Sequence, residues 1–323
     1  MKLNKLLLVI ITIAVLLSFQ STVLATDLNN TSSAITKPYI YPTIPGTDEW
    51  CALKTHQEKI DVCQIPENIL KKMTTEALIE TVLMYPLRVD MLAWDTFDIG
   101  FQNVCQQFNG LRELSARVDA LQKLSYMNSN TLALVDVSNN LEPLYAKVIM
   151  DGISKQNGQE VEHRLILPAY ISTYVSTPEN NPVPVYQDLT WADHGITAEQ
   201  ANQYFNDLLL TYPYAIKKTD CSPAYNCHSY AWYSTSTSNR YWMDDPTTYM
   251  TDNSYISSTA AASGRRVYYN NPGGVYDDHS GIVYSVYSGF VGVRSKWGWA
   301  GVVEHNVYDC PYAGSSTAYT YWY

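Results

Sequence analysis

The residues of this chain whose types and spacing could do chemistry are a cysteine in AYNCHSYAWY, residues 224–233, and a histidine in DDHSGIVYSVYSGFVGVRSKWG, residues 277–298. Asn226 is a favoured helix N-cap residue, so Cys227 falls in the first turn of a predicted helix. The unpaired N–H groups and the positive dipole end of a helix lower the pKa of a thiol and can hold an oxyanion. Cys227 is therefore a candidate nucleophile. A buried or disulfide-bonded cysteine is the alternative interpretation.

The histidine lies at the start of a predicted β-hairpin. Residues 281–287 and 290–294 alternate between apolar and polar side chains on either side of Ser288-Gly289, which is a turn signal. His279, at the mouth of the first strand, would accept the thiol proton and later protonate the leaving amine. The alternative is a histidine at a strand end that touches solvent and does no chemistry.

A catalytic imidazole needs an acceptor that orients its second nitrogen. With a two-residue loop, Lys296 shares a face of the hairpin with His279 and Ser295 points the other way; a one-residue bulge would reverse these faces. A protonated lysine cannot accept a hydrogen bond, which makes Glu304 and His305 in GVVEHNVYDCPY the next polar candidates. We favour His305 as the third site residue.

Metal and cofactor sites have weaker support. Four residues can be drawn as a zinc site: Cys221, Cys227, His228 and His279. The spacing of the two cysteines and the adjacent Cys-His pair fit no usual zinc-ligand pattern. The diglycine at 273–274 follows a proline in an evident turn, so it does not predict a phosphate-binding loop. We expect neither a metal nor an organic cofactor.

The N-terminus and the charge balance predict export. Residues 1–25 have a basic start, an apolar run over 6–17 and small residues at 23–25, the layout of a secretory signal peptide. An uncleaved N-terminal anchor is the alternative. The formal net charge is −10, which argues against nucleic acid and anionic membrane surfaces as partners. We expect a secreted protein, extracellular or cell-wall associated, with no stable membrane anchor after cleavage.

Cysteine and tyrosine contents leave alternatives open. Six cysteines in an exported chain could form three disulfides, for example Cys51–Cys63 and Cys221–Cys310, but the pairing cannot be chosen from sequence. If Cys227 is a free thiol, at least one other cysteine is also unpaired. The 27 tyrosines suit sugar or peptide contact, and equally an aromatic-rich core and surface.

The pattern along the chain predicts an α+β protein in two parts. Residues 26–45 are polar and contain prolines, as in a flexible leader, and residues 46–175 show mostly helical periodicity. Prolines and asparagines mark residues 176–189 as a linker. Residues 190–323 begin with a capped helix over about 197–210 and continue as short alternating runs typical of strands.

The segments quoted above resemble a known group of enzymes. YNCHSYAWY is similar to the nucleophile segment of CHAP-type and NlpC/P60-type amidases, and DHSGIVYSVYSGFVGVRSKWG resembles their histidine segment. The resemblance covers roughly residues 213–312. It implies a papain-like domain with a small antiparallel sheet, Cys227 as nucleophile and His279 as base. The third position, glutamate, asparagine or histidine in those families, falls near Ser295-Lys296, where this chain departs from the pattern.

The resemblance implies a function as well. Many members of these families are hydrolases that cleave amide bonds in bacterial cell walls. We therefore expect a secreted cysteine amidase or peptidase acting on a peptide or peptidoglycan-like substrate. Two other classes remain open. One is a transglutaminase-like acyl transferase, and the other is a non-enzymatic binding module with an aromatic-rich surface.

Overall fold

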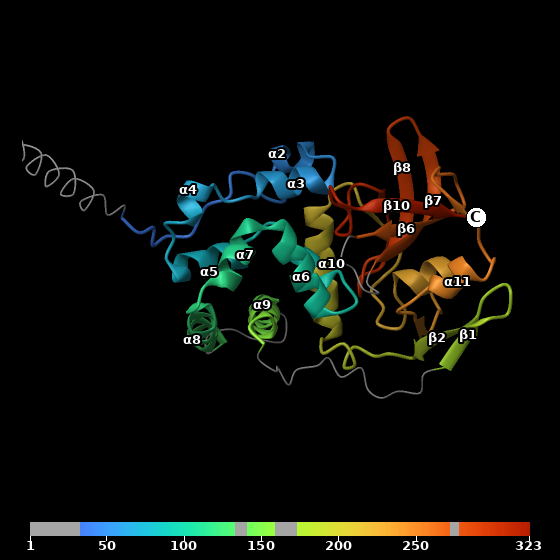
Figure 1. Ribbon diagram of the computed structural model, residues 1–323, viewed down its shortest axis with the longest axis horizontal. Helices are drawn as coiled ribbons and strands as arrows, with labels where there is room; N and C mark the ends of the chain where they lie inside the picture. Colours follow the sequence, from blue (N-terminus) through green and yellow to red (C-terminus); the bar gives the residue numbers. More distant parts are fainter. Residues whose placement is uncertain (1–32, 133–140, 159–172, 272–277) are drawn as a thin grey trace, which may run out of the picture.

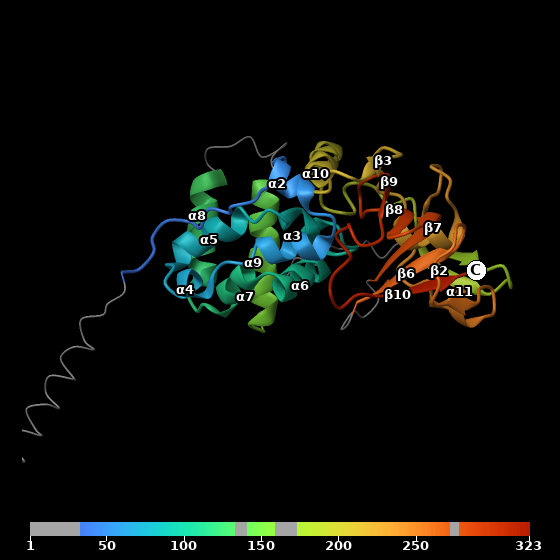
Figure 2. The same cartoon turned by 90° about the horizontal axis from the view of Figure 1, so that it is seen from above.

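The computed structural model describes residues 33–132, 141–158, 173–271 and 278–323, and its fold is α+β with antiparallel sheets (Figure 1). The predicted signal peptide, residues 1–25, lies outside the described residues. Helices gather at one end of the molecule and the larger sheet at the other, with α10 (Ala198–Thr211) between them in both Figure 1 and Figure 2. No helix in the described ranges has the length and apolar character that crossing a bilayer requires.

The N-terminal part is helical, as predicted. Its elements are α2 (Asp48–Ala52), α3 (His56–Val62), α4 (Glu67–Leu70), α5 (Thr75–Leu83), η2 (Arg88–Leu92), α6 (Phe97–Gln107), α7 (Asn109–Ala116), α8 (Ala120–Leu132) and α9 (Glu142–Gln156). Threonine side chains cap several N-termini; Thr55 forms a capping box with Glu58 at the start of α3. The predicted helix α10 begins in the same way, with a capping box between Thr197 and Gln200.

Two segments predicted to be loose have local structure. The described part of the predicted leader packs on the helices: Ile35 forms a parallel bridge with Met73, and the buried Tyr41 donates a hydrogen bond to the Thr81 carbonyl at 3.1 Å. The predicted linker, residues 176–189, contains strand β2 (Pro182–Gln187). Its prolines alternate with buried valines, so the strand places one apolar face inward despite its proline content.

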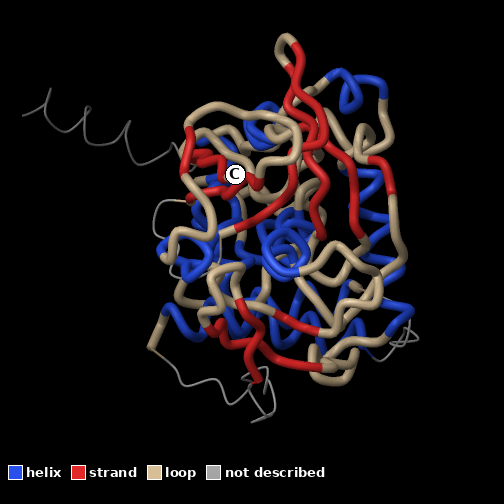
Figure 3. Tube along the Cα trace, turned by 90° about the vertical axis from the view of Figure 1, so that its right-hand side faces the viewer, coloured by secondary structure: helices blue, strands red, loops and turns tan. Residues whose placement is uncertain are grey.

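The strands form two antiparallel sheets. The smaller sheet has the order β1 (Thr173–Ser176), β2, β4 (Tyr241–Trp242). The larger sheet has the order β3 (Ile216–Lys217), β9 (Val302–Asn306), β8 (Phe290–Lys296), β7 (His279–Tyr287), β6 (Arg266–Asn270), β10 (Ala318–Trp322), β5 (Ser257–Ser258). The central hairpin, β7–β8, extends beyond the rest of this sheet (Figures 1 and 3).

This hairpin has the predicted two-residue loop and also a bulge. Tyr287 pairs with Phe290 across the loop, and Gly289 has a φ of +73°. Beyond a register shift between Val283 and Ser285, Ile282 pairs with Arg294. The extra residue in β7 reverses the faces beyond it, so the two-residue register without a bulge is wrong for the site.

The faces of the hairpin follow from the shifted register. A Cβ placed on Gly281 would lie 3.1 Å from the Ser295 Cβ, which puts these two residues on one face. Because side chains alternate along a strand, His279 shares that face with Ser295, and Lys296 lies on the opposite face with Ser280.

One cluster of buried hydrophobic side chains runs from the helices into the larger sheet. It includes Phe108 and Tyr145 from the helical part, Phe205 from α10, and Tyr269 and Trp297 from the sheet end. The helical and sheet parts therefore share a core. The predicted boundaries between domains stay a prediction.

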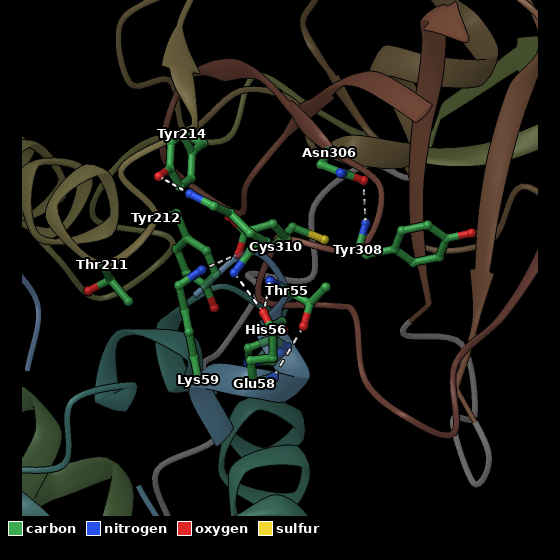
Figure 4. Close-up of polar contacts among 12 residues, drawn as sticks. Thr55, His56, Glu58, Lys59, Thr211, Tyr212, Tyr214, Asn306, Tyr308 and Cys310 are labelled. Atoms are coloured by element: carbon green, nitrogen blue, oxygen red, sulfur yellow. Dashed lines mark hydrogen bonds and ion pairs between the residues drawn. The ribbon is translucent and has the colours of Figure 1, made fainter. Parts of the chain in front are cut away.

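Polar contacts between α3 and the segment after β9 add to this shared core (Figure 4). The Lys59 ammonium pairs with the Asp309 carboxylate, and both side chains are buried. The His56 backbone N–H donates to the Tyr308 carbonyl at 2.9 Å, and its ring contacts the Ala313 carbonyl. These contacts hold the segment that carries Tyr312 against the helical part.

The Lys59–Asp309 pair predicts a large stability effect. Lys59→Met leaves the Asp309 carboxylate buried without its cation, and we expect the free energy of unfolding to fall by about 3 kcal/mol. Denaturant titration measures the change. Lys71→Met, which removes an exposed ion pair with Glu67, is the matched control and changes stability little. Equal effects of the two substitutions would contradict the role given to the buried pair.

Candidate active site

Cys227 lies in the first helical turn, as its sequence context predicts. Cys227 and His228 are helical and lead into η3 (Ser229–Tyr233), a π-helical turn. The Asn226 Oδ1 accepts the Ser229 N–H at 3.1 Å, the bond expected of an N-cap. A π-turn at this position is a local irregularity of a kind often found at functional sites.

Asn226 also fixes this turn to the rest of the fold. Its Nδ2 donates to the Asp95 carboxylate at 2.7 Å and to the Met243 carbonyl at 2.7 Å. Its Oδ1 accepts the Met243 N–H at 3.2 Å as well as the bond within the turn. With all four hydrogen-bonding positions of its amide used, the fully buried Asn226 holds Cys227 in one place.

The electrostatics of the thiol differ from the prediction. Burial raises the pKa of Cys227 well above its ordinary value, and the Asp95 carboxylate raises it further. Hydrogen bonds from the backbone amides of Ser280 and His228, and the Lys296 charge, lower it by less. The predicted low thiol pKa is therefore wrong for this structure, because desolvation outweighs the helix N-terminus. Cys227 is a neutral thiol at neutral pH.

His279 is buried on the strand next to this thiol: the backbone amide of the following residue, Ser280, faces the sulfur, whereas the His279 side chain lies on the other face of the sheet. Its ring stacks on Tyr312, with centroids 3.6 Å apart and planes 4° apart, and meets Tyr269 edge-on. Neither ring nitrogen has a hydrogen-bond partner within the described chain. Burial lowers the pKa of His279 well below its ordinary value, and the neighbouring His305 and His228 lower it further, so the ring is neutral.

The two neighbouring histidines, His228 and His305, each take part in a tryptophan–serine–histidine hydrogen-bond chain. The Trp232 indole N–H and the His228 Nδ1 both bond the Ser280 hydroxyl, at 2.8 and 2.7 Å. Because an indole N–H can only donate, the hydroxyl proton is left for His228. This arrangement makes Nδ1 of His228 an acceptor, consistent with a pKa that burial lowers to about 4.

The second chain lies on the His279 face of the sheet. The Trp297 indole donates to the Ser295 hydroxyl at 3.0 Å, and that hydroxyl contacts His305 Nε2 at 2.8 Å. His305 Nδ1 bonds the Asn306 carbonyl at 2.8 Å. Both ring nitrogens of His305 are thus used, and burial lowers its pKa to about 4. No hydrogen bond joins His305 to His279.

The other candidates for a third site residue fall away from His279. Glu304 forms ion pairs with Arg294 and Lys218. Lys296 lies on the opposite face, where its ammonium donates to the Ser222 and Gly298 carbonyls. Burial lowers the pKa of Lys296 to about 7, against weaker opposing effects of Cys221, Cys227 and Asp95. Its charge therefore acts on the Cys227 side of the sheet.

Three residues of the candidate site were not predicted from the sequence: Asp95, Ser280 and Tyr312. Asp95 and Tyr312 lie outside the two motifs, and Ser280 lies just before the strand predicted over residues 281–287. Tyr312 is fixed by a 2.6 Å hydrogen bond from its hydroxyl to the Ala93 carbonyl, two residues before Asp95. The sequence carries no signal for Asp95, which follows the run 89–94 that already contains another aspartate, the buried Asp90.

All six cysteines are free thiols in the structure, so neither disulfide that the sequence left open is formed. Three or more His, Cys, Asp or Glu side chains placed to hold a metal ion do not occur in the described parts of the chain. Comparison with models of known protein families, with curated proteins and with solved structures found no match.

The buried histidines predict a pH dependence of stability. His194, His228 and His305 have pKa values of about 4 in the folded protein, against about 6.5 when unfolded. Between these values the unfolded chain binds more protons, so the free energy of unfolding falls as the pH drops from about 6.5 to about 4. Chemical denaturation at a series of pH values measures the fall.

Carboxylates titrate in part of the same range, so a variant separates their contribution. His194 donates to the Pro223 carbonyl at 2.9 Å, a bond that glutamine can replace. His194→Gln is expected to make the pH dependence shallower by the share of one histidine. An unchanged slope would show that this ring does not titrate as its burial requires.

Proposed function

We propose that this protein is a secreted cysteine amidase or peptidase in which Cys227 is the nucleophile and His279 the general base. The observations that carry the proposal are a rigidly held helix-N-terminal thiol and, on the strand whose Ser280 amide faces that thiol, a buried imidazole with no hydrogen bond at either ring nitrogen. Buried polar groups in native proteins are nearly always paired, and exceptions are frequent at sites of chemistry. His228 and His305 are less suited to the role, because their nitrogens are already bonded.

The charge states indicate how the reaction begins. Because burial disfavours both the thiolate and the imidazolium, the resting pair is a neutral thiol and a neutral imidazole. The thiol proton moves to His279 as the sulfur attacks the amide carbonyl. The backbone amides of Ser280 and His228 and the Lys296 charge stabilise the negative charge on the sulfur as its proton leaves.

The remaining steps follow from the same groups. The His279 imidazolium donates its proton to the leaving amine as the C–N bond breaks, leaving an acyl group on Cys227. Neutral His279 then removes a proton from water, which attacks the thioester and releases the acid and the free thiol. The Tyr312 ring, parallel to the imidazole, fixes its plane throughout.

Two features of the fold support the proposed papain-like assignment. A cysteine at the start of a helix that packs beside an antiparallel sheet, with a histidine on the central strand β7, is the arrangement that the resemblance implies. We extend the proposal to peptide bonds of cell-wall peptidoglycan as the substrate, which agrees with the signal peptide predicted over residues 1–25.

Substitution of the pair tests the proposal. Cys227→Ser is expected to reduce release of free amino groups from peptidoglycan at least about a thousandfold, and His279→Gln by about a hundredfold or more. Cys63→Ser, at another buried cysteine, is the control and retains activity in the folded protein. Circular dichroism verifies that each variant folds. Full activity in folded Cys227→Ser would exclude thiol catalysis.

Addition of an amine separates hydrolysis from acyl transfer. With a glutamine-containing peptide, a transglutaminase-like enzyme releases more ammonia when a primary amine is supplied. The hydrolase proposed here produces free acid at a rate that the amine does not change. An amine-dependent rate would replace the hydrolase assignment by acyl transfer on the same cysteine.

A further inference from the structure

A cavity of about 340 Å³ lies where the helical part meets the end of β6 and the segment after Tyr312. Its lining includes five carboxamide and three hydroxyl side chains and no charged or aromatic one. Asn103 and Gln107 come from α6, Asn271 follows β6, and Ser316 and Thr317 precede β10. We call this cavity the amide pocket. Its volume is at the lower end of the range for ligand sites.

One hydrogen-bond donor in the amide pocket is buried and unused. The Asn271 Oδ1 accepts the Thr317 hydroxyl at 2.6 Å, which orients the side-chain amide. The Asn271 Nδ2 is buried and has no acceptor among the described residues. A ligand carbonyl that accepted this N–H would recover the free energy lost by leaving the donor unpaired.

Two sets of contacts connect residues of the amide pocket with the candidate active site. The Asn271 backbone N–H donates to the Asp278 carboxylate at 2.9 Å, and Asp278 directly precedes His279. Thr317 contacts the carbonyl of Tyr312 at 3.3 Å, and Tyr312 stacks on the His279 ring. Two lining residues, Asn271 and Thr317, are therefore bonded to the neighbours of His279 in the sequence and in the ring stack.

The lining selects the chemical class of the ligand. Carboxamides offer both a donor and an acceptor, the same pair that a peptide group presents, so they match an extended peptide. Pyranose rings are commonly held by stacking on an aromatic side chain, and this lining has none. No lining residue carries a charge, so the pocket offers a counter-ion to neither an acidic nor a basic ligand.

We infer that the amide pocket binds an uncharged segment of the peptide substrate next to the amide bond that is cleaved. The inference rests on the proposed function and adds a specificity to it. The helical part then has a direct role, because α3 and α6 supply one wall of the substrate site.

Binding to an inactive protein tests the pocket apart from the chemistry. The probe is the blocked peptide acetyl-Ala-Gln-Ala-amide, titrated against Cys227→Ser protein by saturation-transfer NMR. The same peptide with glutamate or with lysine in place of glutamine is expected to bind at least tenfold more weakly. Equal affinities for the three peptides, or no binding of the glutamine peptide, would overturn the inference.

A substitution then locates the binding. Asn271→Asp keeps the acceptor for Thr317 and replaces the unused N–H donor by an oxygen, so the glutamine peptide should bind at least tenfold more weakly. Asn202→Asp, on the exposed face of α10, adds the same charge elsewhere and leaves affinity unchanged. Equal peptide affinity in both variants would place binding outside the pocket.

Two further results separate the hypotheses. If triacetylchitotriose binds instead of the peptide and Asn271→Asp abolishes this binding, the pocket is a sugar site and the peptide assignment is wrong. If the peptide binds as expected but wild-type protein with intact Cys227 cleaves no amide, the pocket stands and the proposed catalysis fails. If the protein cleaves amides but does not prefer uncharged peptides, the proposed catalysis stands and the peptide pocket fails.

Discussion

The attachment of the segment after β9 to helix α3 is the constraint on which the site depends. Lys59 and Asp309 form a buried ion pair. His56 bonds the carbonyls of Tyr308 and Ala313, which lie on either side of Asp309 in the sequence. Between these contacts lies Tyr312, whose ring is parallel to His279 at 3.6 Å. Together with the bond from the Tyr312 hydroxyl to the Ala93 carbonyl, these contacts let the helical part fix the ring on which the imidazole stacks.

The interior around the site is buried, and its polar groups are arranged to stay neutral. Two tryptophan–serine–histidine chains, one on each face of the larger sheet, occupy His228 and His305. The same desolvation that keeps these rings uncharged raises the pKa of the Cys227 thiol. In the proposed reaction the proton would therefore move as the new bond forms, because a standing thiolate–imidazolium pair would be costly at this depth.

Local features of the site could be predicted from sequence, and long-range ones could not. The N-cap at Asn226 places Cys227 in a helical turn through bonds within four residues, and the hairpin loop follows from two turn residues. The bulge at Tyr284 is set by packing across strands, and it reverses which residues share a face with the histidine. Asp95 and Tyr312 reach the site only through the shared core, and the thiol pKa depends on burial that no local pattern reports.

The most direct test of this account is the rate of iodoacetamide labelling of the unreduced native protein against pH, with the modified cysteine identified by peptide mass. Cys63 and Cys310 are also buried thiols, no histidine is among the groups that shift their pKa values, and they serve as internal controls. The account predicts that Cys227 is labelled faster than both at neutral pH and that His279→Gln removes the difference. Labelling of Cys227 no faster than Cys63 and Cys310, or a rate unchanged by His279→Gln, would contradict it.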